Sequence, residues 1–258
     1  MMMHGSHVTW ILPVMVVLFM VMGCAQQPVQ RYGSVIGIEE QNIPEYKKLH
    51  AEAWPGVLKR LDKCNIQNYS IYLGEVKPGK HYLFSYYEYT GSDFQADMAK
   101  MKKDETTQKW WKLTDPLQTP LATRQDGQWW ADWEEVFHFA GAPSDKKPAR
   151  YGSIIGIAKE NLLAYTQLHA AVWPGVLAAI ERCNIRNYSI YLGQIEPGQY
   201  LLFSYFEYIG DDFEKDMKDI ADEVTKKWWT YTDPLQIPLE GRQEGQWWKS
   251  MEEVFHME

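Results

Sequence analysis

The sequence predicts an α+β fold in which two ferredoxin-like βαββαβ repeats pair face to face as a barrel within one chain. The first observation is an internal repeat, because the stretch that begins at Arg31 recurs from Arg150 and more than half of the aligned residues are identical. The second is the order of predicted elements within each copy. The third is that helices cover one face of such a sheet, so a second, similar sheet is the simplest cover for the other face.

The elements of the first copy follow from local patterns. Residues 32–38 form an apolar strand, and Asn42 can cap a helix that runs to about Cys64 and is interrupted at Pro55. Residues 67–76 and 80–89 are strands rich in Tyr, Ile, Leu and Phe, joined by a Pro-Gly turn as a hairpin. A second helix over 94–113 and a last strand over 133–139 complete the βαββαβ order.

The repeat also sets the domain boundaries, which are 31–139 for the first domain and 150–258 for the second. Residues 140–149 are small, charged and Pro-containing, which is typical of a linker. The two domains are expected to pair within one chain.

The N-terminus predicts export. Residues 10–22 are an apolar run of the length of a signal-peptide core, short for a membrane span. Together with Gly23 and Cys24 the segment resembles a bacterial lipoprotein signal. That resemblance implies a signal peptide over 1–23, a lipid on Cys24 as the only membrane attachment, and a tether over 24–30. Ala25 after the cysteine favours the periplasmic face of a Gram-negative envelope; an uncleaved anchor or an ordinary secretory signal are the alternatives.

Charge and cysteine usage exclude some classes of function. The net charge of -8 argues against a nucleic-acid surface, because phosphate binding needs clustered cations. Cys64 and Cys183 each stand in the same Cys-Asn-Ile string. Two buried thiols at matching places are favoured over a disulfide, which an oxidising compartment would permit. No Cys/His cluster has metal-ligand spacing, so no metal site is expected.

A tyrosine and a histidine on the first helix are candidates for acid–base chemistry. Tyr46 and His50 are spaced i, i+4, which places them on one helical face, and Tyr165 and His169 repeat the pair. Histidine both gives and takes a proton near neutral pH. The alternative is a packed histidine on a helix that covers a sheet.

Aromatic residues are abundant, with Trp 12 and Tyr 16, and such rings stack on sugars or fill a core. Period two in the strand over 67–76 places Tyr69 on one face and Tyr72 on the other, so one tyrosine row can face the barrel interior. The equivalent of Tyr69 is Tyr188. Adjacent Trp110 and Trp111 point about 100° apart on a helix, so one is expected in the core and the other at a cavity mouth. Their copies are Trp228 and Trp229.

Three other repeated motifs are interpreted as structural. They are the tryptophan pair over 129–130, the Thr-Asp-Pro-Leu-Gln turn over 114–118, and Glu134-Glu135 on the last strand. For the glutamates a solvated edge is favoured over an inward carboxylate that binds a sugar hydroxyl.

The ordered set Tyr-x-x-x-His-x-x-x-Trp-Pro, Asn-Tyr-x-Ile-Tyr-Leu, Trp-Trp and Glu-Val-Phe resembles the L-rhamnose mutarotase family over nearly all of each copy. The resemblance implies a dimeric α+β barrel, formed here within one chain. It also implies an isomerase that interconverts the α and β anomers of L-rhamnose or a related sugar without metal or organic cofactor. His50 and His169 take the catalytic role. The implied substrate-binding residues are Tyr46, Tyr69, Trp110, Trp111, Tyr165, Tyr188, Trp228 and Trp229.

Two other classes of function use parts of the same pattern. A sugar-binding surface lipoprotein without turnover would use the aromatic residues and would not need His50. A small monooxygenase or a haem-linked protein is the third class, because the same barrel hosts those activities and fold does not fix function.

Overall fold

The structure, a computed structural model, describes residues 28–258. The predicted signal peptide, the lipidation site at Cys24 and residues 24–27 of the predicted tether lie outside the described residues. Within 28–258 no single helix is long and apolar enough to cross a membrane. The bent helix pair Lys159–Ala170 and Pro174–Arg182 reaches the required length and apolar composition only when its two helices are taken together.

The two halves of the chain contain matching series of elements. The first half contains β1 (Gln30–Ile38), α1 (Ile43–Ala51), α2 (Pro55–Lys63), β2 (Ile66–Lys77), β3 (Lys80–Tyr89), α3 (Phe94–Lys102), α4 (Glu105–Thr114), β4 (Gln118–Thr119) and β5 (Ala131–Phe139). The second half contains β6 (Ala149–Ile157), α5 (Leu162–Ala170), α6 (Pro174–Arg182), β7 (Ile185–Glu196), β8 (Gln199–Tyr208), α7 (Phe213–Asp219), α8 (Glu223–Thr232), β9 (Gln236–Ile237), β10 (Lys249–Ser250) and β11 (Glu252–Met257).

The helices differ from the sequence prediction in two places. The break before Pro55 is confirmed, since α1 ends at Ala51 and α2 begins at Pro55. The side chain of Asn42 does not cap α1, and its Nδ2 instead donates to the carbonyl of Leu117. The single helix predicted over 94–113 is wrong because Asp104 caps a new helix, α4, by accepting from the backbone N–H of Thr107.

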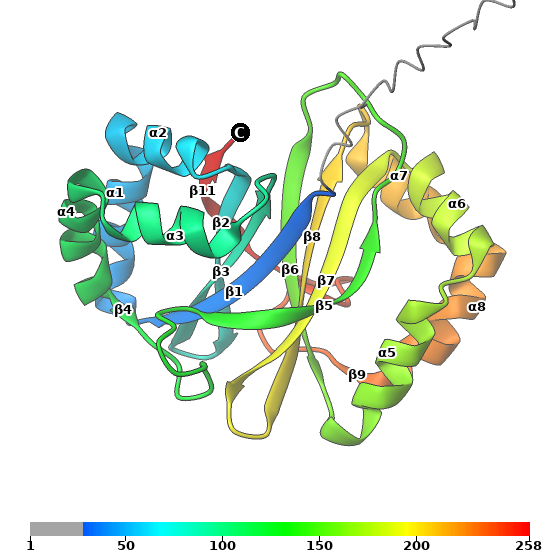
Figure 1. Ribbon diagram of the computed structural model, residues 1–258. Helices are drawn as coiled ribbons and strands as arrows, with labels where there is room; N and C mark the ends of the chain where they lie inside the picture. The colour runs from blue at the N-terminus through cyan, green and yellow to red at the C-terminus, as the bar shows by residue number, and fades with distance from the viewer. Residues whose placement is uncertain (1–27) are drawn as a thin grey trace, which may run out of the picture.

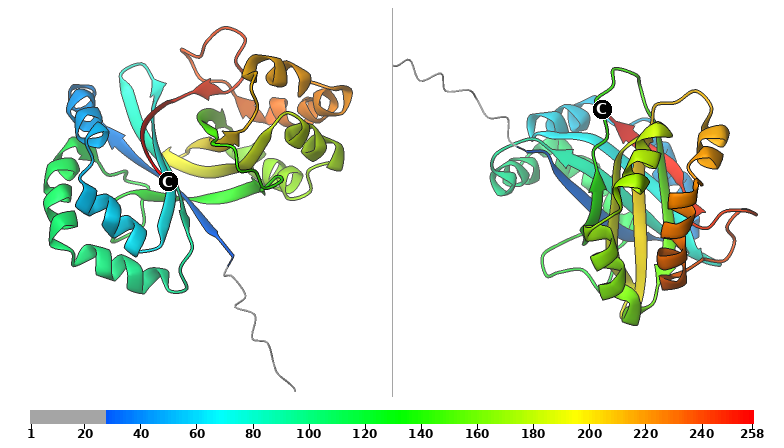
Figure 2. Two further views of the ribbon diagram at one scale, coloured as in Figure 1. Left: turned by 90° about the horizontal axis from the view of Figure 1, so that it is seen from above. Right: turned by 90° about the vertical axis from the view of Figure 1, so that its right-hand side faces the viewer.

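The strands form one antiparallel system, and the predicted α+β fold is confirmed. In the first half the order is β5-β1-β3-β2, and in the second it is β10-β6-β8-β7. The last strand of each half also joins the other half, because β5 continues onto β7 and β11 pairs with β2. The helices of each half lie on the outside and the two sheets face each other (Figure 1; Figure 2).

Aromatic packing between the two sheets forms the central core. Tyr86 of β3 stacks on Tyr205 of β8 with ring centroids 3.7 Å apart. Phe84 and Phe203 lie beside them at 5.5 Å. All four side chains are buried, so neither half presents its inner sheet face to solvent.

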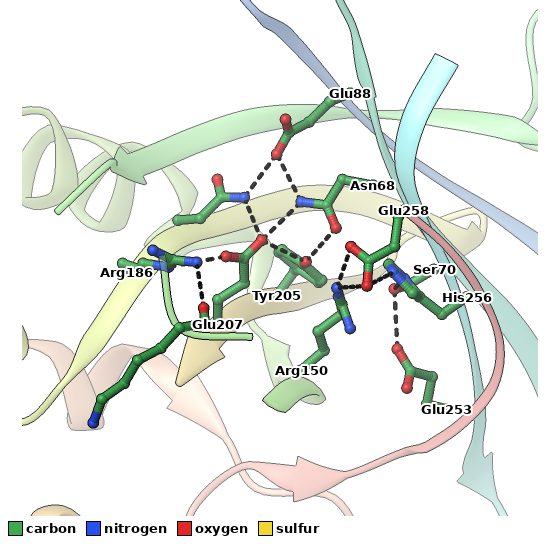
Figure 3. Close-up of polar contacts among 12 residues, drawn as sticks. Asn68, Ser70, Glu88, Arg150, Arg186, Tyr205, Glu207, Glu253, His256 and Glu258 are labelled. Carbon is green, nitrogen blue, oxygen red and sulfur yellow. Dashed lines mark hydrogen bonds and ion pairs between the residues drawn. The ribbon is translucent and has the colours of Figure 1, made fainter. Parts of the chain in front are cut away.

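A polar cluster crosses the interior of the barrel beside these rings (Figure 3). Asn68 Nδ2 donates to Glu88 at 2.9 Å and to Glu207 at 2.7 Å, and Asn187 Nδ2 donates to the same two carboxylates. Both asparagines adopt left-handed backbone conformations, with φ of 47° and 44°, at irregularities in the β2 and β7 registers. Asparagine tolerates this conformation better than most residues, and a bulge re-aims the side chains that follow it.

Gly33 and Gly152 allow close approach between the two halves, and Gly33 provides a stability test. A Cβ at Gly33 would lie 2.5 Å from Cγ of Tyr191, and Gly152 meets Tyr72 in the same way. Gly33→Ala is therefore expected to lower the free energy of unfolding by about 1–3 kcal/mol, measured by chemical denaturation. In a Tyr191→Ala background the same change should cost clearly less; an equal cost would contradict the packing explanation.

Cys64 and Cys183 are free, buried thiols, which confirms the prediction made for them. They follow α2 and α6 at matching positions in the two halves. Burial raises the pKa of both thiols, so both stay protonated at neutral pH and act as small core residues.

Candidate functional site

Each half contains a cavity between its helices and the outer face of its sheet. The cavity in the first half has a volume of about 370 Å³ and that in the second about 460 Å³, within the usual range of roughly 300–1,000 Å³ for small-molecule sites. The site residues predicted for the first half all line the first cavity: Tyr46, His50, Tyr69, Trp110 and Trp111. Those predicted for the second half all line the second: Tyr165, His169, Tyr188, Trp228 and Trp229.

The imidazole of His50 is held in one orientation by its own helix and by aromatic rings. Its ring stacks on Tyr46 with centroids 4.0 Å apart and meets the edge of Trp110 at 5.4 Å. His50 Nδ1 lies 2.9 Å from the backbone carbonyl of Tyr46. Because a carbonyl only accepts, Nδ1 carries the hydrogen, and the neutral ring keeps its lone pair on Nε2. His169 repeats this arrangement, with Nδ1 3.0 Å from the carbonyl of Tyr165.

Burial controls the charge of both histidines. It lowers the pKa of His50 to about 4, against the smaller, opposite effect of the hydrogen bond to the Tyr46 carbonyl. Burial also lowers the pKa of His169 to about 4. Both imidazoles are therefore neutral at pH 7, and each Nε2 is a proton acceptor.

The tyrosine of each stacked pair is a hydrogen-bond donor without a protein partner. The hydroxyls of Tyr46 and Tyr165 are buried and make no hydrogen bond of good geometry to the described residues, although Gln118 lies near the first and Gln236 near the second. Burial raises the pKa of both well above the usual value, so both remain protonated. A buried hydroxyl without a partner costs about 1–3 kcal/mol, and a polar ligand in the cavity would supply that partner.

Tyr69 and Tyr72 lie on opposite faces of β2 and contact different parts of the molecule. Tyr69 lines the cavity on the helix side, and burial raises its pKa. Tyr72 fills the barrel interior, where its ring lies 6.2 Å from that of Phe203. The tyrosine at the cavity thus does not face the barrel interior, contrary to the expectation that an interior row would offer its hydroxyl.

The two adjacent tryptophans in each cavity wall are buried to different extents. Trp110 is buried, with 6% of its surface exposed, whereas Trp111 is half-buried. Trp228 and Trp229 repeat this difference. Each pair thus offers one fixed ring beside the histidine and one more accessible ring.

Sequence reasoning missed several cavity residues by assigning them to structure alone. Asp115, Gln118, Trp129 and Trp130 all line the first cavity. Trp129 Nε1 donates to Gln118 Oε1 at 2.7 Å. Trp247 and Gln236 repeat the bond at the same distance. The recurrence of these motifs in both copies is the signal that could have found them.

Each cavity is completed by the other half of the chain. Phe255 of β11 lines the first cavity and meets the edge of His50 with centroids 5.6 Å apart. Phe137 of β5 lines the second and lies 5.8 Å from His169. The exchange of last strands between the sheets places these rings, so neither half alone supplies a whole cavity wall.

Glu134, Glu252 and Glu253 are exposed, in keeping with the solvated edge that was expected, whereas Glu135 is half-buried. Glu135 accepts from Arg31 Nε at 3.0 Å and from Ser189 Oγ at 2.9 Å. Glu253 accepts from Ser70 Oγ at 3.0 Å, as Figure 3 shows. One glutamate of each pair thus joins β5 to β7 and β11 to β2. Among residues 28–258 no group of three or more His, Cys, Asp or Glu side chains is placed to hold a metal ion.

Comparison with known proteins identifies one family for both halves of the chain. The family model of L-rhamnose mutarotase matches residues 31–139 and again 150–257. The L-rhamnose mutarotase of Lactiplantibacillus plantarum is 32% identical over 110 residues, which cover 42% of this chain and 98% of the relative. That of Bacillus subtilis is also 32% identical over 110 residues, covering 42% and 97%.

A solved structure from Fusobacterium nucleatum, described as a candidate monooxygenase, covers 88% of this chain and 94% of its own with a TM-score of 0.50. At 11% identity this likeness concerns the fold alone. The two family matches cover nearly all of both repeats. The chain therefore belongs to the L-rhamnose mutarotase family.

Proposed function

We propose that this protein is an isomerase, an aldose mutarotase that interconverts the α and β anomers of L-rhamnose or a closely related sugar. The observation that carries the proposal is a neutral imidazole with its tautomer set by a backbone carbonyl, inside an aromatic cavity, once in each half. Membership of the family supports the choice of sugar.

The reaction moves one proton between two oxygens on the same carbon. His50 Nε2 takes the proton of the anomeric hydroxyl as the C1–O5 bond breaks and O1 becomes the aldehyde oxygen. The imidazolium then gives that proton to O5, so the protein ends as it began. A pKa of about 4 makes the imidazolium a strong acid that returns its proton readily.

Ring closure after rotation about C1–C2 repeats these steps in reverse and gives the other anomer. The Tyr46 hydroxyl, protonated and without a protein partner, donates to the oxygen on which charge develops. Trp110 and Trp111 hold the apolar face and edge of the sugar. His169, Tyr165 and the tryptophans of the second half take the same roles.

The domain assignment supports two catalytic units per chain. Domains 31–139 and 150–258, joined by the linker 140–149, are proposed to correspond to the two subunits of a dimeric α+β barrel, fused into one chain. The matching strand orders and the crossing of β5 and β11 support this correspondence.

Anomer-exchange NMR tests the proposed activity. Saturating the α-anomer proton of L-rhamnose should reduce the β-anomer signal in the presence of catalytic amounts of protein. The exchange rate should rise in proportion to protein concentration above the spontaneous rate. A protein that binds L-rhamnose without accelerating exchange would be a sugar-binding protein and would contradict the proposal.

A further inference from the structure

A glutamine in each cavity wall is held by a tryptophan at the cavity mouth. Gln118 lines the first cavity together with Tyr46, and its Oε1 accepts a hydrogen bond of 2.7 Å from Trp129 Nε1. Trp129 also lines this cavity, and 44% of its surface is exposed. In the second cavity Gln236 accepts from Trp247 at the same distance. The contact is therefore a repeated part of the site.

The backbone that carries the glutamine is also fixed. Gln118 begins β4 and lies opposite Ile38 of β1, and Asn42 Nδ2 donates to the carbonyl of the preceding Leu117 at 3.1 Å. The second half repeats both contacts. The side chain of the glutamine thus starts from a fixed point on the sheet and ends at a hydrogen-bonded indole, which leaves its amide little freedom.

The bond from the tryptophan also fixes which way the amide is turned. An indole N–H only donates, so the atom that it meets is the amide oxygen, and the other end of the amide is the NH₂ group. Gln118 lies near the Tyr46 hydroxyl, and Gln236 near that of Tyr165. Burial raises the pKa of both tyrosines, and the neighbouring amide acts in the opposite direction, as an N–H donor to the phenolic oxygen does.

We propose that Gln118 and Gln236 are positioning residues, which turn the hydroxyl hydrogens of Tyr46 and Tyr165 toward the sugar. This inference rests on the proposed mutarotase function. A hydroxyl hydrogen rotates to suit its neighbours, and a hydroxyl whose oxygen accepts from an NH₂ group keeps its own hydrogen for another partner. In the cavity that partner is the sugar oxygen on which charge develops. The donor is then already aimed before the reaction begins.

Two substitutions of Gln118 test the inference in His169→Ala protein, which keeps only the first site. Anomer exchange of L-rhamnose is measured by NMR over a range of sugar concentrations. Gln118→Leu should lower kcat by about tenfold with little change in KM, because the lost alignment matters where charge develops. Gln118→Glu keeps an acceptor for Trp129 and should lower kcat further, because a carboxylate takes the hydrogen of the Tyr46 hydroxyl away from the sugar. Circular dichroism checks that both variants are folded.

A Tyr46→Phe background separates positioning from a purely structural role. There Gln118→Leu should have little further effect on kcat, since the hydroxyl that the amide positions is missing. Gln108→Leu is the matched control, because Gln108 is exposed on α4 and does not line the first cavity, and it should leave kcat unchanged.

Two results would overturn the inference while leaving the mutarotase function intact. One is an undiminished kcat in either Gln118 variant. The other is an equal loss from Gln118→Leu with and without the Tyr46 hydroxyl, which would show that the glutamine does not act through the tyrosine. Absence of anomer exchange in the parent protein would instead reject the proposed function.

Discussion

Replacing both His50 and His169 by alanine is expected to lower the rate of anomer exchange by about 10²–10⁴-fold, the usual contribution of a positioned acid–base group. Each imidazole is the proton acceptor of its cavity, with Nδ1 occupied by a backbone carbonyl and Nε2 available to the sugar. Each single replacement should leave the other cavity active. Saturation-transfer NMR on folded variants, checked by circular dichroism, measures the effect.

His81→Ala is the control, since His81 lies on β3 and lines neither cavity.

The pH profile of the exchange rate adds a second criterion. With pKa values of about 4 the histidines remain unprotonated down to roughly pH 5, so the rate should be level from pH 8 to 5 and fall below that. A double variant with the parental rate, or a rate that rises steadily as the pH falls from 7 to 4, would rule out a neutral imidazole as the base.

Lowering the pH from 6.5 to 4 is expected to reduce the free energy of unfolding by several kcal/mol. Burial lowers the pKa of His50, His169 and His138 from 6.5 to about 4. Between these values the unfolded chain binds protons that the folded chain does not, so stability is retained above pH 6.5 and falls toward pH 4. His50 and His169 each contribute at most about 3 kcal/mol, and the more exposed His138 contributes less.

Carboxyl groups also contribute to this profile. Burial raises the pKa of Asp115 and Asp233, which opposes the histidine effect as the pH falls. Urea denaturation at several pH values measures the profile. The variant His50→Gln, His169→Gln should lose less stability between pH 6.5 and 4 than the parent. Identical slopes in the two proteins would show that these imidazoles do not remain neutral in the fold.

Much of the molecule was predictable from the sequence because it depends on local chemistry. The repeat that starts at Arg31 and Arg150, the strand at Lys80–Tyr89 and the helix break before Pro55 follow from identity, alternation and the missing N–H of proline. The stacked pair Tyr46 and His50 is also local, since i, i+4 spacing fixes the side chains on one helical face. These features use only the geometry of one element.

Tertiary structure decided the features that join distant parts of the chain. Asp104 starts a new helix, and its carboxylate also binds Arg60 of α2, so the break is supported by a contact distant in sequence. Likewise, no local pattern indicates which sheet a terminal strand will join, and the pairing of β11 with β2 is what brings Phe255 to His50.

The face of the sheet that carries the site was also decided by the fold. The alternation of side chains along a strand shows that Tyr69 and Tyr72 lie on opposite faces of the sheet. It does not show which of the two faces is toward the barrel interior and which is toward the helices. Only the stacking of the second sheet over Tyr72 leaves Tyr69 to the helices and the cavity. The sequence by itself thus determined which residues share an element and a face. The packing of one half on the other determined which face became a cavity, because burial is a property of the whole chain.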